Sequence, residues 1–141
     1  MRQAKWGRLL LAAALLATTG VAMAIEPVDL GKRDYNLKCA SCHGLTGKGD
    51  GYFQPLLTVA PSNLSVLTKK NNGVFPTDRV VQTIDGRTDV SAHGPREMPI
   101  WGRDYALMGG EIYFDVPYDG NAFVRGRILA LVDYLNRLQI Y

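Results

Sequence analysis

The chain has 141 residues, of which 47% are hydrophobic and 21% charged, and its formal net charge is +3. This length suffices for one domain of ordinary size. The excess positive charge comes entirely from the amino terminus, because residues 25–141 contain 13 basic and 13 acidic side chains. Such a balanced chain lacks the basic stripe of a nucleic-acid-binding protein, so we expect no nucleic-acid partner.

The first 24 residues are predicted to be a signal peptide. Three basic residues within the first eight precede an apolar stretch over residues 9–21, and Ala-Met-Ala at 22–24 fits a small-x-small cleavage site. An uncleaved membrane anchor is the alternative, although the apolar stretch is shorter than the roughly 20 residues that a membrane span needs. We therefore expect a single exported domain over residues 25–141.

The first predicted helix of this domain runs from Leu30 to about Cys39. Asp29 supplies a capping carboxylate, which complements the exposed amides at the start of a helix. Gly31 and Tyr35 lie four residues apart and therefore share one helix face.

The pentapeptide Cys39-Ala40-Ser41-Cys42-His43 is the most specific feature of the chain. This spacing is the attachment motif of a c-type haem. The two thiols lie about one helical turn apart, so each can add to one vinyl group of the same porphyrin, and the histidine that follows can ligate the iron. We expect one haem, joined to Cys39 and Cys42, with His43 as an axial ligand.

Other uses of the two cysteines fit the sequence less well. A redox dithiol is typical of a βαβ context, and the chain shows no such alternation. A zinc site would need Cys39, Cys42, His43 and His93, and His43 is tied too closely to Cys42 to ligate the same ion easily. A disulfide within four residues would be strained.

Loops are predicted on both sides of a second helix. The glycine-rich residues 44–51 must form a loop, and residues 54–73 are interpreted as irregular chain. The second helix is predicted over residues 77–84, with Thr77 as its cap and Gly86 at its end.

The last third of the chain is predicted to hold loops and one further helix. Residues 91–102 are interpreted as loop, and residues 103–124 as an extra loop or short hairpin that carries several aromatic side chains. Within residues 125–138 the hydrophobic residues recur at helical spacing. They are Ile128, Leu131, Leu135 and Leu138.

Together these features resemble those of class I cytochromes c, the small exported monohaem proteins of bacteria. The resemblance rests on Gly31 and Tyr35, the Cys39 to His43 motif, the glycine loop, Pro61-Ser62-Asn63-Leu64, Met98-Pro99 and Tyr134-Leu135. It implies an all-α cytochrome c fold, in which about three to five helices pack around one covalently bound haem c with long loops between them. The first and last helices would cross near a right angle, so that Gly31 and Tyr35 meet Leu131 and Tyr134.

Two features of the predicted haem site concern the axial ligands. By the resemblance, the carbonyl of Pro61 accepts a hydrogen bond from the second ring nitrogen of His43, which would orient the imidazole and raise its basicity. Met98 is the favoured sixth ligand, because it lies in a loop and is followed by a stiffening proline. Met108 and His93 are the alternatives. A methionine ligand raises the reduction potential of a haem, and a second histidine lowers it.

The predicted function is electron transfer by one haem c that cycles between Fe(II) and Fe(III), with redox proteins as donor and acceptor. The chain would be a carrier in the periplasm and no enzyme. One alternative is a haem subunit of a membrane oxidase or dehydrogenase complex. Another is a haem enzyme or sensor with an open or displaceable sixth ligand. Exposed aromatic side chains favour interfaces, so residues 103–124 form a hypothetical docking surface.

Overall fold

The computed structural model describes residues 26–86 and 98–141, and these form an all-α fold with no strand among them. The predicted signal peptide and His93 lie outside the described residues. The six α-helices and two 3₁₀ turns follow in chain order. They are α1 (Leu30–Lys38), α2 (Ala40–His43), η1 (Gln54–Leu56), η2 (Leu64–Val66), α3 (Leu67–Lys70), α4 (Thr77–Asp85), α5 (Trp101–Ile112) and α6 (Gly120–Arg137).

The all-α prediction is confirmed, and the helices are of two kinds. Four of them have nine or more residues, whereas α2 and α3 are single turns of four. None of the helices in the described part of the chain is both apolar and long enough for a membrane span.

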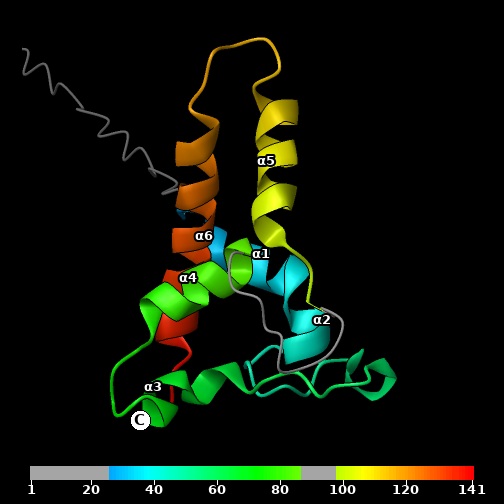
Figure 1. Ribbon diagram of the computed structural model, residues 1–141, viewed down its shortest axis with the longest axis vertical. Coiled ribbons are helices and arrows are strands. Elements are labelled where there is room, and N and C mark those ends of the chain that lie inside the picture. The colour runs from blue at the N-terminus through cyan, green and yellow to red at the C-terminus, as the bar shows by residue number, and fades with distance from the viewer. Residues whose placement is uncertain (1–25, 87–97) are drawn as a thin grey trace, which may run out of the picture.

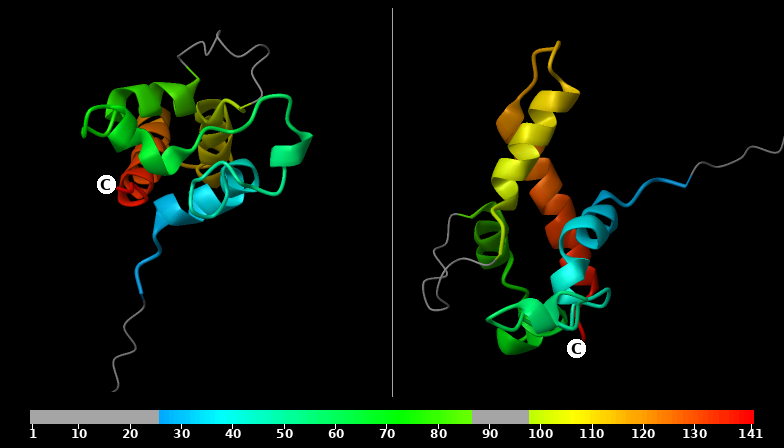
Figure 2. Two further views of the ribbon diagram at one scale, coloured as in Figure 1. Left: turned by 90° about the horizontal axis from the view of Figure 1, so that it is seen from below. Right: turned by 90° about the vertical axis from the view of Figure 1, so that its right-hand side faces the viewer.

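The four longer helices divide the molecule into a lower body and an upper hairpin (Figure 1). The carboxyl-terminal half of α6 packs against α1 and α4, while its amino-terminal half runs beside α5 as a projecting pair. Residues 44–70 form a layer of loops and short helices under α2 and α4. The two further views show the hairpin leaving the body and α1 crossing α6 (Figure 2).

The crossing of α1 and α6 depends on the absence of a side chain at Gly31. A Cβ atom at that position would overlap the backbone carbonyl of Ala130 and lie 3.0 Å from the Cβ of Tyr134. One helical turn later, the ring of Tyr35 lies 5.2 Å from the ring of Tyr134, centroid to centroid. The predicted contact of Gly31 and Tyr35 with Tyr134 is therefore confirmed, and Leu131 is buried in the same core.

The helix ends agree with the sequence analysis in part. Asp29 caps α1 as predicted, since its carboxylate accepts a hydrogen bond of 2.9 Å from the Lys32 amide. Thr77 is the first residue of α4 and not its cap, which is Pro76. Gly86 ends α4 with a φ of +82°, a left-handed conformation that glycine adopts freely.

The prediction of a loop or short hairpin over residues 103–124 is wrong. These residues belong largely to α5 and to the first turn of α6, which begins at Gly120 with Asp119 as its cap. The adjacent glycines 109 and 110 lower the helix propensity of this stretch. Gly109 is nevertheless required inside the helix, because a Cβ atom there would lie 2.9 Å from the ring of Phe123. Packing of the two helices therefore outweighs local propensity.

The close approach at Gly31 gives a prediction with a matched control. We expect Gly31→Ala to lower the free energy of unfolding by about 1–3 kcal/mol, because the added methyl group must displace backbone atoms of α6. Gly126→Ala makes the same chemical change within α6, where a Cβ atom would meet nothing within 4 Å. It should leave stability unchanged or raise it by up to about 1 kcal/mol. Urea unfolding of the two variants measures both effects, and equal stability would contradict this account of the crossing.

Candidate haem site

One helical turn carries the two thiols and the imidazole of the predicted motif. Cys39 follows α1 directly, and its amide donates to the Tyr35 carbonyl at 2.9 Å, so the motif continues from the buried helix. The amide of His43 donates in turn to the Cys39 carbonyl at 2.8 Å. Both cysteines are free thiols, and neither is bonded to the other. The chain thus presents Cys39, Cys42 and His43 on a short, fixed segment.

The glycine-rich loop closes back on this turn and holds its carboxyl-terminal end. Three amides of the loop donate to carbonyls that the short helix leaves without partners. These hydrogen bonds join the Gly49 amide to the His43 carbonyl at 2.8 Å, the Gly51 amide to the Cys42 carbonyl at 3.1 Å and the Phe53 amide to the Ser41 carbonyl at 2.8 Å. A Cβ atom at Gly51 would overlap the backbone of Ser41 and Cys42, so the loop approaches the motif as closely as backbone permits.

The imidazole of His43 is oriented by the chain that follows the loop. Its Nδ1 lies 2.9 Å from the carbonyl oxygen of Ser62. Because a carbonyl only accepts, Nδ1 carries the proton and Nε2 retains its lone pair for a metal. The prediction that Pro61 is the acceptor is wrong by one residue. The Pro61 carbonyl instead faces Gly49, where a Cβ atom would overlap it.

Burial favours the form of His43 that can ligate iron. It lowers the pKa of the imidazole, and the hydrogen bond to Ser62 opposes this shift in part. The neutral imidazole is therefore stabilised inside the protein. A neutral ring with a protonated Nδ1 and a free Nε2 is the state that coordinates a metal.

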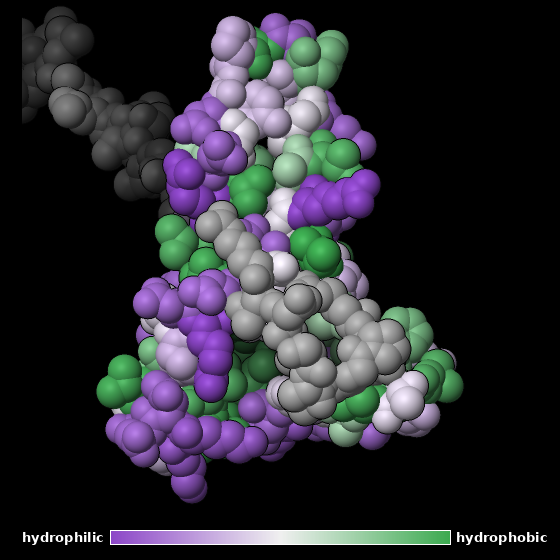
Figure 3. Space-filling view, in the orientation of Figure 1, coloured by the Kyte–Doolittle hydropathy of each residue, from purple (hydrophilic) through white to green (hydrophobic). Residues whose placement is uncertain are grey.

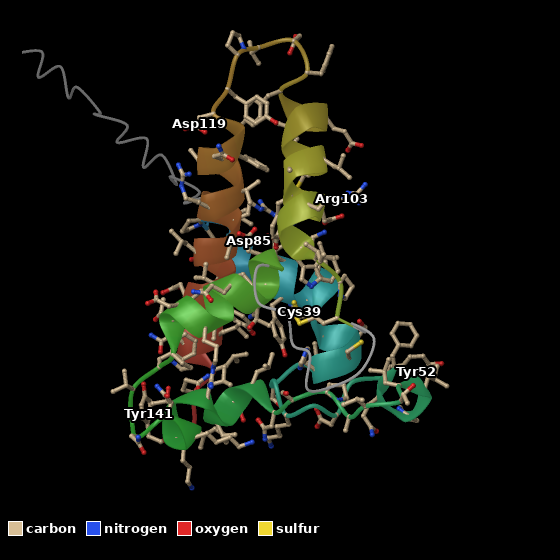
Figure 4. All side chains as sticks on the ribbon, viewed as in Figure 1. Cys39, Tyr52, Asp85, Arg103, Asp119 and Tyr141 are labelled. Atoms are coloured by element: carbon tan, nitrogen blue, oxygen red, sulfur yellow. The ribbon has the colours of Figure 1, made fainter. Side chains whose placement is uncertain are left out.

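Cys39 lies in the hydrophobic core. Its side chain belongs to the buried cluster formed by α1, α4, α5 and α6. Burial, with a smaller contribution from the nearby Asp34 carboxylate, raises the pKa of Cys39 to about 12. Since the thiolate is the attacking species in disulfide exchange, such a thiol suits a redox motif poorly. Figure 4 places Cys39 in the middle of the molecule, below the hairpin.

The structure brings one candidate sixth ligand to this core from the loop before α5. Met98 is partly buried and packs against the cluster that contains Cys39. Met108, on α5, packs against the same cluster. His93 lies outside the described residues. Met98 precedes α5 by three residues, so the packing of α5 fixes where the methionine enters the body.

The described residues do not support the zinc alternative. Over residues 26–86 and 98–141, no group of three or more His, Cys, Asp and Glu side chains is arranged to hold a metal ion. The fourth zinc ligand considered from the sequence, His93, lies outside these ranges.

Exposed hydrophobic side chains lie on the loop after the motif. Tyr52, Phe53 and Leu56, on the loop after the motif, are all exposed, and Tyr52 points outward at the edge of the body (Figure 4). Figure 3 shows hydrophobic side chains around a recess in the lower half of the molecule, below α4. The donor set fits a c-type haem because it combines two unpaired thiols with an oriented neutral imidazole.

The structure shows a charged cluster between α1, α5 and α6 that the sequence did not predict. Asp34 pairs with Arg127, and Lys38 with Asp104. Asp34 is almost fully buried and directly precedes the buried Tyr35 in α1. The position of Asp34 next to a core tyrosine could have predicted a buried ion pair, because a buried charge requires a partner. The sequence alone does not indicate that the partner is Arg127, which is 93 residues away.

Comparison with known families gives one match. A family profile described as Cytochrome c matches residues 28–99, about half of the chain. Comparisons with curated proteins and with solved structures gave no match. The matched segment contains the whole pentapeptide, the glycine loop, Ser62 and Met98, and the described residues have the all-α fold that this family implies. The chain belongs to the cytochrome c family.

Proposed function

We propose that this protein is a class I cytochrome c that transfers electrons between redox partner proteins outside the cytoplasm. Members of the family carry covalently bound haem c and are generally electron carriers. In the proposal one haem joins Cys39 and Cys42, with His43 and Met98 as axial ligands. The hydrogen bond from His43 Nδ1 to Ser62 carries the proposal, because it leaves Nε2 free beside two unpaired thiols.

The haem supplies a one-electron Fe(II)/Fe(III) couple, and the residues of the chain set the conditions for it. The Ser62 carbonyl fixes the plane of the His43 ring and makes it a stronger donor. Three amides of the glycine loop hold the backbone of the same turn. These hydrogen bonds orient the His43 ring and the backbone of the motif, so a bound haem would meet an imidazole that is already in place.

Met98 is proposed as the second axial ligand. It lies in the segment matched to the family, is followed by Pro99, and packs against the core that contains Cys39. Met108 is a residue of α5, and its contact with the core serves helix packing. A thioether ligand favours the ferrous state and so raises the reduction potential.

The loop after the motif supports contact with redox partners. Tyr52 is 84% exposed and Leu56 76%, yet the backbone of this loop is tied to the motif through Phe53 and Ser41. Exposed aromatic side chains on a rigid support are typical of interface centres. We propose that a partner docks over this loop and receives the electron there.

The tip of the hairpin supports a second contact surface, which we call the hairpin tip: Tyr113, Phe114, Val116 and Tyr118. The rings of Tyr113 and Tyr118 stack with centroids 5.0 Å apart, and Phe114 is 83% exposed. The 12 residues of α5 place this surface about 18 Å from the base of the hairpin. Contact there would hold a partner or a larger complex in place. The exposed hairpin tip therefore favours the alternative in which the chain is a permanent subunit of an oxidase or dehydrogenase complex.

Export to the periplasm is the proposed location. It rests on the basic start, the apolar run over residues 9–21 and the small residues at 22–24. The proposed attachment of haem through two thioether bonds agrees with export, because c-type cytochromes are assembled outside the bacterial cytoplasm.

The ligand assignment is tested with two methionine variants of the haem-loaded protein. We expect Met98→Ala to abolish the thioether-to-iron absorption band of the ferric form and to lower the midpoint potential, because the iron loses an axial sulfur. Met108→Ala should keep both the band and the potential. Potentiometric titration with recorded spectra measures both properties.

The same variants separate the carrier from the haem enzyme. A carrier with a bound methionine should take up cyanide slowly, and Met98→Ala should take it up rapidly. Rapid uptake by the parent protein, with a high-spin ferric spectrum, would support the enzyme or sensor instead. An unchanged band in Met98→Ala would overturn the assignment of this ligand.

The role of the Pro61–Ser62 segment in orienting the His43 imidazole is tested by a pair of glycine variants. Gly49 and Gly73 have nearly equal φ values of +85° and +83°, so an alanine at either position has a similar backbone cost, about 1–2 kcal/mol. Only Gly49 lies against the Pro61 carbonyl, next to the residue that accepts from His43. We expect Gly49→Ala to change the midpoint potential and to lose further stability, whereas Gly73→Ala should keep the parent potential. Equal potentials in the two variants would contradict the role of this segment in orienting the imidazole.

A further inference from the structure

The node between α1, α5 and α6 is a set of five residues that join the hairpin to the motif-bearing helix: Asp34, Lys38, Asp104, Tyr105 and Arg127. Its centre is the ion pair of Asp34 with Arg127, whose side chains are 2% and 15% exposed. A second ion pair joins Lys38 to Asp104, with side chains 15% and 45% exposed. The node therefore places four formal charges in and around the core.

Aromatic rings lie against the two cations of the node. Tyr105 is fully buried, and the Arg127 guanidinium lies 5.6 Å from its ring centroid. The Lys38 ammonium lies 4.9 Å from the ring centroid of Trp101 and 5.4 Å from that of Tyr105. Charges in such surroundings act over longer distances than charges in water, because the effective dielectric constant is lower.

The charges of the central pair are only partly compensated by hydrogen bonds. Arg127 donates to Asp34 Oδ1, and the buried Tyr105 hydroxyl interacts with the same carboxylate, while Arg127 Nε has no hydrogen-bond partner among the described residues. Charges that are buried in this way are screened less than charges at the surface. Asp34 and Cys39 are both buried and lie five residues apart along the chain.

The node also adjoins the motif along the chain. Lys38 is the residue before Cys39, and Asp34 lies one turn earlier on α1. Both ion pairs therefore act on the segment that would be joined to the porphyrin, and neither includes an axial ligand. Within the part of the chain that the structure describes, no other ion pair includes a residue that is almost fully buried.

We propose that this node tunes the reduction potential of the haem in addition to the axial ligands, through the opposed charges of Asp34 and Arg127. The ferric haem carries one more positive charge than the ferrous haem. The carboxylate of Asp34 favours the ferric form, and the guanidinium of Arg127 favours the ferrous form. The node balances these two effects. The inference rests on the proposed function only in requiring a haem at Cys39.

The first test is a set of three variants of the haem-loaded protein. Asp34→Asn leaves the charge of Arg127 without a counter-ion, and arginine cannot lose its proton. We expect the midpoint potential to rise, so that the ferrous-to-ferric ratio at a fixed potential increases about tenfold, or about 59 mV for a one-electron couple. Arg127→Lys keeps the charge and should keep the potential near that of the parent. The double variant Asp34→Asn with Arg127→Met removes both charges and should return the potential toward the parent value.

A second test uses a substitution at a more exposed residue, so that it does not depend on the folding of Asp34→Asn. Asp34→Asn leaves a buried charge unpaired and can prevent folding, whereas Asp104 is nearly half exposed and tolerates substitution better. Asp104→Asn frees the charge of Lys38 beside Cys39. We expect a smaller rise of the midpoint potential, which decreases with added salt because this pair is partly open to solvent. Spectra of each variant show whether the axial ligands are retained.

Unchanged potentials in the single Asp variants that fold, with parent-like spectra, would overturn the inference and leave the node a purely structural device. A lowered potential in either of them would also overturn it, because the predicted sign is positive. Failure of the proposed function is recognised separately, by a parent protein that carries no haem or lacks the methionine band.

Discussion

The hydrogen bond from His43 to Ser62 is the interaction on which the proposed site depends. It joins two segments 19 residues apart and determines which ring nitrogen is free. Several other contacts serve this bond. The amides of the glycine loop hold the backbone of His43 and Cys42, and the amide of Leu64 donates to the Gly47 carbonyl at 2.6 Å, which holds the Ser62 segment against the same loop. The Tyr35 hydroxyl donates to the Gly44 carbonyl at 2.6 Å inside the core, so α1 is bonded to the loop that follows the motif. The site is therefore an extension of the helix packing and not a separate feature.

The hairpin of α5 and α6 is the part of the molecule that extends beyond the segment matched to the family, since the match ends at residue 99. Its lower half closes the core through Tyr105, Ile128 and Leu131, and its two ion pairs with α1 connect it to the motif. Its upper half, by contrast, carries the exposed hairpin tip. One element thus combines a packing role near Cys39 with a surface far from it. In the proposed function, a partner is held at the hairpin tip and the electron passes at the loop after the motif.

Much of the site follows from local sequence, and the rest depends on distant contacts. The order Cys39, Cys42, His43 predicts the attachment of a c-type haem without further information. The structure shows close backbone approaches at Gly31, Gly49 and Gly51. The acceptor of His43 was predicted one residue too early, at Pro61 and not at Ser62, because the peptide orientation at 61–62 depends on how the loop packs. The sequence did not predict α5, because a glycine such as Gly109 usually disfavours a helix. Its place in α5 is explained only by the contact with the Phe123 ring, which local sequence does not show. The partner of Asp34 depends on the crossing of α1 and α6, which local patterns do not encode.

The central claim is that a porphyrin is joined covalently to this chain through Cys39 and Cys42. Mass spectrometry of the protein matured in a host that attaches c-type haem tests it most directly, on the intact chain and on the peptide that contains the motif. We predict an added mass of one haem, located on that peptide, with neither thiol open to alkylation. A bare chain in which both cysteines react with the alkylating reagent would contradict the account.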